Sequence, residues 1–374
     1  LQLHMCIRYR SLSIPTEMGF DYFYGYNCQR MAHNLYPPHL WENNNRDILD
    51  NEVISPKLKL QSGQDPYDED NYKIFNQKDY APDKMHIKAQ DFIEKNKDNP
   101  FFLYYASPIP HAPLQAPEYL IEKYRKIIGD EEPYLGNVGY FPTRYPRATY
   151  AAMIEYIDIQ VGEIVQQLKD NGIYENTIIM LTSDNGPTYA GGVDFKYFNS
   201  TGVFQNDPKR MKGYTYEGGV RVPFIVSWPN KIKSKRVIDD ISISYDIFPT
   251  ITELSGVNDS NTYPTDGISL YNIFTDKNSS LERDYIYWEF PSYGGQLAAR
   301  MGDYKAILKD IKKGNKQIEL YNLSIDLKEQ NDISSEYPDI VRYFENIIKK
   351  EHVRSDIERF EMGYIDEIKS LKNE

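Results

Sequence analysis

The chain has 374 residues, of which 40% are apolar and 26% are charged, so it can form a large folded core and wholesale disorder is not expected. Its formal net charge of -12 argues against a general nucleic-acid-binding protein, because affinity for the phosphate backbone requires a basic surface. No apolar run approaches the length of a membrane span. The two cysteines, Cys6 and Cys28, are too few for a disulfide framework or a zinc ribbon.

The first part of the chain predicts one helix and one strand after a long polar segment. Residues 42–82 are polar and indicate a surface excursion with little regular structure. Residues 83–96 predict an amphipathic helix, because their apolar side chains recur on one face. Residues 101–106 are short and almost wholly apolar, which is typical of a buried strand. This strand leads directly into a proline-rich loop at 107–113.

The next segments repeat the alternation of helix and strand. A helix is predicted over 147–170, where apolar residues step by three and four and Asn-Gly follows as a stop signal. The residues expected on its buried face are Ile154, Ile157, Val161, Ile164 and Leu168. Residues 177–182 predict a second buried strand, and residues 222–228 predict a third strand. This alternation indicates an α/β sheet with helices on both faces.

From about residue 281 the pattern changes to short strands separated by turns. Strands are expected at 285–290, 297–301, 304–308 and 318–323, followed by a helix at 337–350. Such a pattern indicates a small antiparallel sheet with a helix. We therefore expect two domains, residues 1–280 and residues 281–374.

Polar residues stand next to the three predicted α/β strands, and ligands of open α/β sheets bind outside the carboxyl ends of the strands. His111 follows the first strand, Asp184 and Asn185 follow the second, and Lys212 lies in the loop before the third. The two adjacent oxygen ligands suit Ca²⁺ or Mg²⁺ better than zinc. Each residue also has an ordinary explanation: a turn, a histidine bonded to its own loop, or a solvated lysine. From the residues alone both explanations stay open.

Several segments, in the same order along the chain, resemble the sulfatase family. The similar segments are Gly-Phe-Asp at 19–21, the His-x-Pro loop at 110–117, the strand-end metal motif at 181–186, Lys212 with Glu-Gly-Gly-x-Arg-x-Pro at 217–223, and residues 302–306 and 319–323. The chain is identified as a member of the sulfatase branch of the alkaline-phosphatase-like superfamily. The resemblance implies an α/β fold with a large mixed sheet flanked by helices, and a smaller C-terminal α+β domain on an antiparallel sheet.

The resemblance also implies a mechanism and a substrate class. In that family a Cys or Ser is oxidised to formylglycine, whose hydrate attacks sulfur, and a Ca²⁺ held by three Asp and one Asn neutralises the sulfate oxygens. Asp184 and Asn185 then become Ca²⁺ ligands, with Mg²⁺ the less favoured ion. Lys212 becomes a catalytic contact to a sulfate oxygen, and His111 becomes a catalytic contact to sulfate or to the leaving oxygen, able to donate a proton.

The implied substrate is a sulfated carbohydrate or an aryl sulfate. A sulfatase-maturing, formylglycine-generating enzyme would be a partner, and the location would be extracytoplasmic. Specificity is expected from loops and from the second domain, with Trp288, Glu289 and Arg300 as candidates.

The first residues fit the family poorly. Cys6 has the Cys-to-Arg spacing of the nucleophile motif, but Arg8 stands where the family has proline, so Cys6 is not expected to be the nucleophile. His4 stands about where a family histidine would fall and is a weak candidate. No Asp-Asp pair precedes the Gly-Phe-Asp segment. We therefore expect this chain to lack the nucleophile segment and to be inactive alone.

Two other functions stay open. A hydrolase of phosphate mono- or diesters from the same superfamily would use more Asp and His ligands and two metals. A non-catalytic binding protein would keep the sulfatase fold without the nucleophile. The presence of His111, Asp184, Asn185 and Lys212 together favours an enzyme.

Overall fold

The computed structural model describes residues 14–257, 264–276 and 278–366. The chain divides into two compact units, one made of Leu1–Thr177 with Thr188–Phe198 and the other of Ile178–Pro187 with Asn199–Glu374. The chain therefore passes from one unit to the other three times. None of the described helices is long and apolar enough to cross a membrane. The predicted boundary near residue 281 falls inside the second unit, and that subdivision stays a prediction.

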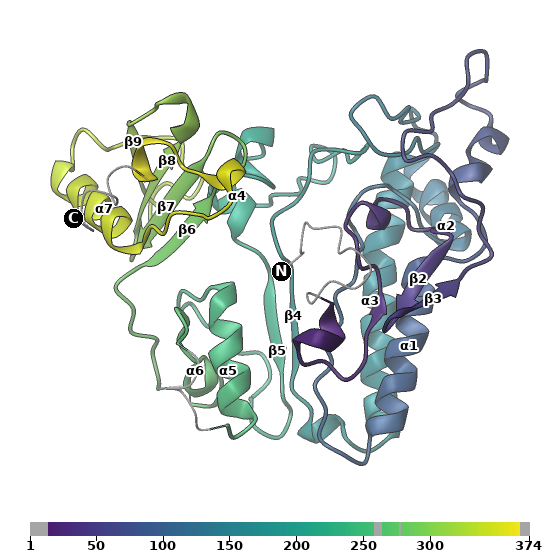
Figure 1. Ribbon diagram of the computed structural model, residues 1–374, viewed down its shortest axis with the longest axis horizontal. Coiled ribbons are helices and arrows are strands. Elements are labelled where there is room, and N and C mark those ends of the chain that lie inside the picture. The colour runs from purple at the N-terminus through teal and green to yellow at the C-terminus, as the bar shows by residue number, and fades with distance from the viewer. Residues whose placement is uncertain (1–13, 258–263, 277, 367–374) are drawn as a thin grey trace. The chain divides into compact units, whose positions relative to one another are not determined.

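The first unit combines three α-helices with a small antiparallel sheet (Figure 1). The helices are α1 (Ala81–Asn96), α2 (Glu118–Ile128) and α3 (Pro146–Asp170). The sheet has the order β1 (Tyr24–Gly25), β2 (His39–Glu42) and β3 (Asn45–Ile48). Short 3-10 turns lie at η1 (Pro15–Met18), η2 (Met31–His33), η3 (Glu69–Phe75) and η4 (Tyr174–Asn176).

Both helices predicted in this unit are confirmed, and the predicted buried face of α3 is confirmed in part, since Leu168 is buried and Ile157, Val161 and Ile164 are half-buried. Ile154 is exposed, whereas Ala148, Ala152 and Met153 are buried against Leu120 of α2. Small side chains let two helix backbones approach closely, and the larger residues of α3 then lie beside that contact. The apolar period thus identified the helix, but the residues that contact its neighbour were set by side-chain size.

The buried strand predicted at 101–106 is wrong. No described strand pairs with this segment, and Phe102 and Tyr104 are 54% and 60% exposed. Their neighbours in the segment are half-buried, so exposure alternates with the two-residue period of an extended chain. An apolar composition can indicate an extended segment, but it does not show whether neighbouring elements pair with that segment and bury it.

The second unit contains an antiparallel sheet covered on both faces (Figure 1). Its strands are β6 (Ile286–Phe290), β7 (Gln296–Met301), β8 (Tyr304–Lys309) and β9 (Ile318–Asn322), followed by α7 (Pro338–Glu351). These four strands and this helix confirm the prediction. Successive side chains of a strand point to opposite faces. Leu297 and Ala299 accordingly pack on α7, whereas Ala298 packs on Tyr216, in the loop before α4 (Glu217–Val220).

A separate antiparallel pair in this unit joins β4 (Ile179–Thr182) to β5 (Phe224–Ser227), with Thr182 opposite Phe224. Met180 and Val226 pack on α6 (Tyr271–Thr275). Their neighbours Leu181 and Ile225 are exposed on the other face, so the predicted full burial of β4 is wrong. Among the described residues, this two-stranded pair is the part of the expected large mixed sheet that is formed. The remaining elements are α5 (Ile247–Leu254), η5 (Pro208–Arg210), η6 (Ser244–Asp246), η7 (Ile311–Lys313) and η8 (Glu358–Phe360).

A buried histidine ties the end of α7 to β6. His352 is 1% exposed, with Nδ1 2.9 Å from Glu289 Oε1 and Nε2 3.0 Å from Asp366 Oδ1. A neutral imidazole has a single N–H, so donating to both carboxylates requires the charged form. Burial lowers the pKa of His352, but the hydrogen bonds to Glu289 and Asp366 outweigh burial and raise this pKa overall.

We expect His352 to make folding stability depend on pH. Because its pKa is raised in the folded state, its contribution is complete below the ordinary histidine pKa and is lost as the pH rises through the raised value. The free energy of unfolding, measured in urea between about pH 6 and pH 9, should therefore fall more in the wild type than in His352→Gln. Equal pH dependence in the two proteins would show that the imidazolium contributes nothing.

Candidate active site

Asp184 and Asn185 lie directly after β4, where the sequence places them. The Asp184 side chain is exposed, and Asn185 is half-buried. The Asn185 Nδ2 donates a hydrogen bond to the carbonyl oxygen of Gly186 at 2.9 Å, so the amide oxygen can point toward a ligand. The pair thus offers a carboxylate and an amide oxygen, the hard donors that Ca²⁺ and Mg²⁺ prefer. These two residues fit part of a Ca²⁺ site.

The turn after Asn185 is pressed against the start of α4. The Gly186 N–H donates to the Gly219 carbonyl oxygen at 2.9 Å. A Cβ on Gly186 would lie 2.0 Å from the carbonyl oxygen of Gly218, and a Cβ on Gly219 would lie 2.1 Å from that of Tyr214. No side chain fits at Gly186 or Gly219, so glycine is required for this close approach. Backbone contact therefore joins two motifs that are separate in the sequence.

Lys212 belongs to the same arrangement. Its backbone N–H donates to the carbonyl oxygen of Pro187 at 3.1 Å, two residues beyond Asn185. The side chain is half-buried. Burial lowers the pKa of Lys212, and the nearby charge of Asp184 acts in the opposite direction. The structure thus brings three of the four predicted site residues, Asp184, Asn185 and Lys212, into one neighbourhood.

The loop that carries Lys212 is held by a buried glutamine of β7. The Gln296 Nε2 donates to the Gly213 carbonyl oxygen at 2.8 Å, and its Oε1 accepts from the Thr215 N–H at 3.2 Å. Gln296 is fully buried, so each lost bond would leave a buried polar group unpaired. Gln296 was not predicted from the sequence. Its only signal was a polar residue at the start of an apolar strand.

Next to this loop is a buried cluster of charges, Glu217, Lys305 and Glu329. The Lys305 Nζ is 2.8 Å from Glu217 Oε1 and 3.1 Å from Glu329 Oε1, and Lys305 is 0% exposed. The Glu329 Oε2 also accepts the backbone N–H of Glu217 at 2.8 Å. The cluster therefore connects the first residue of α4 to the sheet. Glu217 and Lys305 stood in segments that resembled the family, but their pairing was not predicted.

Burial and charge act differently on the two carboxylates of this cluster. Burial would raise the pKa of Glu217, but the charges of Lys305, Arg300 and Arg221 outweigh burial and hold this pKa below its ordinary value. Burial raises the pKa of Glu329, and Lys305 offsets only part of that effect. Glu217 is thus the carboxylate that Lys305 chiefly stabilises as an anion.

His111 lies in the first unit, on the loop that the sequence predicted. Its Nδ1 is 2.6 Å from the carbonyl oxygen of Ala112, which can only accept, so Nδ1 carries the proton. His33 stacks on the His111 ring at 5.5 Å with 4° between the planes, and Tyr140 approaches both rings edge-on. The sequence analysis missed His33 and Tyr140. The meeting of His111 with Asp184, Asn185 and Lys212 stays a prediction.

The other sequence candidates have different outcomes. His4 and Cys6 lie outside the described residues. Cys28 is disulfide-bonded, which suits a structural role. Of the specificity candidates, Glu289 pairs with His352, and the Arg300 guanidinium is 3.6 Å from Glu217. These two side chains are therefore engaged inside the unit.

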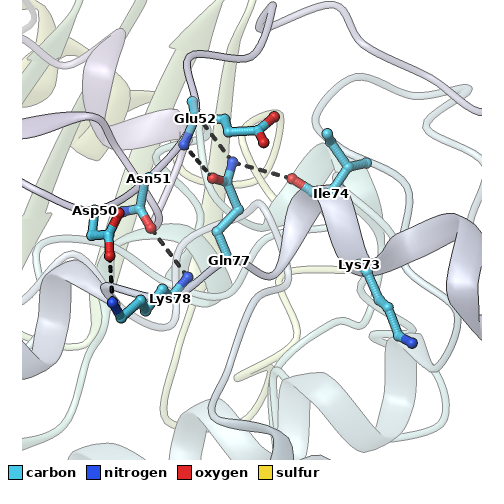
Figure 2. Close-up of a pocket in the computed structure, with 7 residues that line it drawn as sticks. All are labelled: Asp50, Asn51, Glu52, Lys73, Ile74, Gln77 and Lys78. Atoms are coloured by element: carbon cyan, nitrogen blue, oxygen red, sulfur yellow. Dashed lines mark hydrogen bonds and ion pairs between the residues drawn. The ribbon is translucent and has the colours of Figure 1, made fainter.

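A pocket of about 550 Å³ in the first unit contains none of the predicted site residues (Figure 2). It is lined by Asp50, Asn51, Glu52, Lys73, Ile74, Gln77 and Lys78. Lys78 pairs with Asp50, and Gln77 bonds to the backbone of Glu52 and Ile74. Most of its polar groups thus bond to one another, and the pocket is not part of the candidate active site.

The amino-acid sequence matches two protein families. The family described as "Sulfatase" matches residues 8–257, and the family described as "N-sulphoglucosamine sulphohydrolase, C-terminal" matches residues 208–354. The chain belongs to the sulfatase family. The predicted membership is confirmed, and the C-terminal match of this sulfatase covers the sheet that holds the Lys212 loop.

Individual relatives agree with this placement. An uncharacterized sulfatase of Schizosaccharomyces pombe is 27% identical over 87% of the chain, and an arylsulfatase of Clostridium perfringens is 28% identical over 75%. The sulfatase chain spans 69% and 59% of the lengths of these two relatives. The solved structure of Ps i-CgsB in complex with k-i-k-neocarrahexaose matches 90% of the chain and 68% of its own, at 26% identity and a TM-score of 0.67. The α/β, alkaline-phosphatase-like fold is thereby confirmed.

Proposed function

We propose that this sulfatase chain carries part of the active site of a Ca²⁺-dependent hydrolase of sulfated carbohydrates that uses a formylglycine nucleophile. The observation that carries the proposal is the position of Lys212, which backbone bonds hold beside Asp184 and Asn185. An ammonium next to two hard oxygen ligands suits a divalent cation and an oxyanion together. The relative solved with k-i-k-neocarrahexaose supports a carbohydrate substrate.

Each residue then has a role that follows from its contacts. Asp184 and Asn185 would hold the Ca²⁺, which neutralises sulfate oxygens and activates the nucleophile when bound. Lys212 binds a sulfate oxygen as a point charge and stabilises the charge that develops on the leaving oxygen. The Nδ1 proton of His111 is directed to the Ala112 carbonyl oxygen, so Nε2 would be the nitrogen that contacts sulfate or the leaving oxygen. Donation from Nε2 to the leaving oxygen requires His111 to be protonated on both nitrogens.

The proposal extends to maturation and location. The formylglycine would be made by a sulfatase-maturing enzyme, and the mature protein would act outside the cytoplasm, as the resemblance implies. Incubation of the full native polypeptide with such an enzyme, followed by mass spectrometry, tests the first point.

The proposed reaction is tested with matched esters. The mature native polypeptide is assayed with a chromogenic sulfate ester, sulfated oligosaccharides and para-nitrophenyl phosphate, with and without a Ca²⁺ chelator. We expect sulfate esters to be hydrolysed in preference to the phosphate ester, and Ca²⁺ removal to abolish turnover. Preference for the phosphate ester would favour the phosphate hydrolase, and binding of sulfated sugar without turnover would favour the non-catalytic protein.

Asp184→Ala is expected to weaken Ca²⁺ binding and activity together. Removal of groups that merely orient a metal ligand costs about 10- to 100-fold, so loss of a direct ligand should cost at least about 100-fold. Isothermal titration with Ca²⁺ and a sulfate-ester assay measure the two effects in the native polypeptide. Asp339→Ala, which removes an exposed carboxylate on α7, is the control. Unchanged Ca²⁺ affinity in Asp184→Ala would remove this residue from the site.

A further inference from the structure

The loop between β6 and β7 places an exposed aromatic ring beside the candidate sulfate contact. Tyr293 is 57% exposed. A Cβ built on Gly213 would lie 2.9 Å from the Tyr293 ring, so this ring covers the α-carbon of the residue that follows Lys212. Gly213 itself has φ +93°, a conformation that glycine adopts freely. The backbone of the Lys212 loop therefore passes directly beneath the tyrosine.

The Tyr293 ring is held in place although it is exposed. Phe290 stacks on it at 5.9 Å with 20° between the planes, and the Tyr214 ring centroid lies 5.8 Å away with 42° between the planes. The loop that carries it is anchored by hydrogen bonds from Lys312 N–H to Gly294 O at 2.8 Å and from Ile311 N–H to Gly295 O at 3.3 Å. A ring fixed before binding loses little conformational entropy when a ligand packs on it.

The backbone of Tyr293 adds an independent observation. Its φ is +50°, in the left-handed region, which is rare and unfavourable for a bulky side chain. Such strain persists where the surrounding structure imposes it, and it concentrates at active sites, ligand-binding positions and switch regions. Here the strained conformation presents the ring to solvent beside Lys212, so burial of the tyrosine does not explain it.

We propose that Tyr293, with Phe290 and Tyr214, is a stacking platform for the sugar rings of the substrate next to the sulfate held by Lys212. The Tyr293 ring centroid lies 5.9 Å from that of Phe290 and 5.8 Å from that of Tyr214, so the three rings form one aromatic cluster. The C–H face of a sugar packs on the negative face of an aromatic ring. An oligosaccharide can contact several rings of this cluster, whereas a small aryl sulfate has a single ring.

The inference rests on the proposed function and specifies the substrate as an oligosaccharide. Its test uses Tyr293→Asn, because asparagine tolerates the left-handed conformation and keeps the loop while the ring is removed. Tyr293→Phe keeps the ring, and Tyr343→Ala removes an exposed tyrosine of α7 as a control. Mature native polypeptide is assayed with 4-nitrocatechol sulfate and with a panel of sulfated carrageenan and glycosaminoglycan oligosaccharides.

We expect Tyr293→Asn to raise KM for the preferred oligosaccharide about three- to tenfold with kcat nearly unchanged, and to leave kcat/KM for 4-nitrocatechol sulfate unchanged. Tyr293→Phe and Tyr343→Ala should behave like the wild type. An unchanged oligosaccharide KM in Tyr293→Asn, an equal loss with the aryl sulfate, or a wild type that accepts no oligosaccharide of the panel would overturn the proposal.

A binding measurement separates this inference from the proposed reaction. The panel and its desulfated counterparts are titrated into unmatured protein and followed by ligand NMR, which needs no turnover. If the mature protein hydrolyses no sulfate ester but Tyr293→Asn loses oligosaccharide binding, the reaction fails and the platform stands. If the protein hydrolyses sulfate esters but both proteins bind the oligosaccharides equally, the reaction stands and the platform fails.

Discussion

Replacement of Lys212 by alanine is expected to lower kcat for sulfate-ester hydrolysis by about 10²- to 10³-fold, because a positive group aimed at the developing charge is removed. Ca²⁺ should stay bound, since the ammonium is no metal ligand and Asp184 and Asn185 are unchanged. Steady-state kinetics and Ca²⁺ titration of the native polypeptide measure the two quantities. Joint loss of metal and activity would mean that the alanine variant has lost the loop structure rather than a substrate contact.

The pH dependence of activity gives a second test of the role of Lys212. Burial lowers the pKa of Lys212, and Asp184 offsets part of that effect, so its charge is lost at a lower pH than that of a solvated lysine. Activity that depends on the charged form is complete below this lowered pKa and falls as the pH rises through it. Lys212→Arg keeps a charge at all these pH values and should lack this alkaline fall. The same fall in both proteins would assign it to another group.

Replacement of Lys305 by methionine should destabilise the protein by about 3–5 kcal/mol at neutral pH, because it leaves two buried carboxylates without the cation between them. Urea unfolding measures this change in the free energy of unfolding. Lys313→Met is the matched control, since the Lys313 side chain is 74% exposed in its pair with Asp310 and such pairs contribute about 0–1 kcal/mol. A loss below about 1 kcal/mol in Lys305→Met would show that the cluster is not a structural element.

Measurements of unfolding at acidic pH separate the loss of the Lys305 charge from the loss of its packing. In the wild type the pKa of Glu217 is held below its ordinary value, so its stabilising contribution is present above the ordinary glutamate pKa and is lost as the pH falls through the lowered value. In Lys305→Met protonation of the buried carboxylates would relieve the unpaired charge. The deficit relative to wild type should therefore shrink on acidification. Added Glu217→Gln and Glu329→Gln substitutions should also restore part of the stability at neutral pH.

The spacing of apolar residues within a segment was sufficient to predict several helices and strands. The helices α1 and α7 and the strands β6 to β9 follow from such patterns, and all were predicted. Burial was predicted less well, because it depends on what lies alongside. Phe102 and Leu181 stand in equally apolar segments, yet both are exposed.

The candidate site shows the same limit. Asp184, Asn185 and Lys212 were predicted because short motifs mark their chemistry. Gln296 and Lys305 were not, since their bonds to the Lys212 loop and α4 join positions 81 to 88 residues apart, and no local pattern reports them. Tyr293 was hidden for another reason: it is one of 33 tyrosines, and its exposure and left-handed backbone are properties of the fold.

Because the chain crosses between the two units three times, its gene cannot be recombined unit by unit with a single crossover. Residues 188–198 belong with the first unit, although they are encoded between the two stretches of the second. A single crossover with a relative would therefore split at least one unit, wherever it fell between residues 178 and 198. A chimera that exchanges the second unit whole needs junctions at all three crossings. Asp184 and Lys212 would then be inherited together, while residues 188–198 between them came from the other parent.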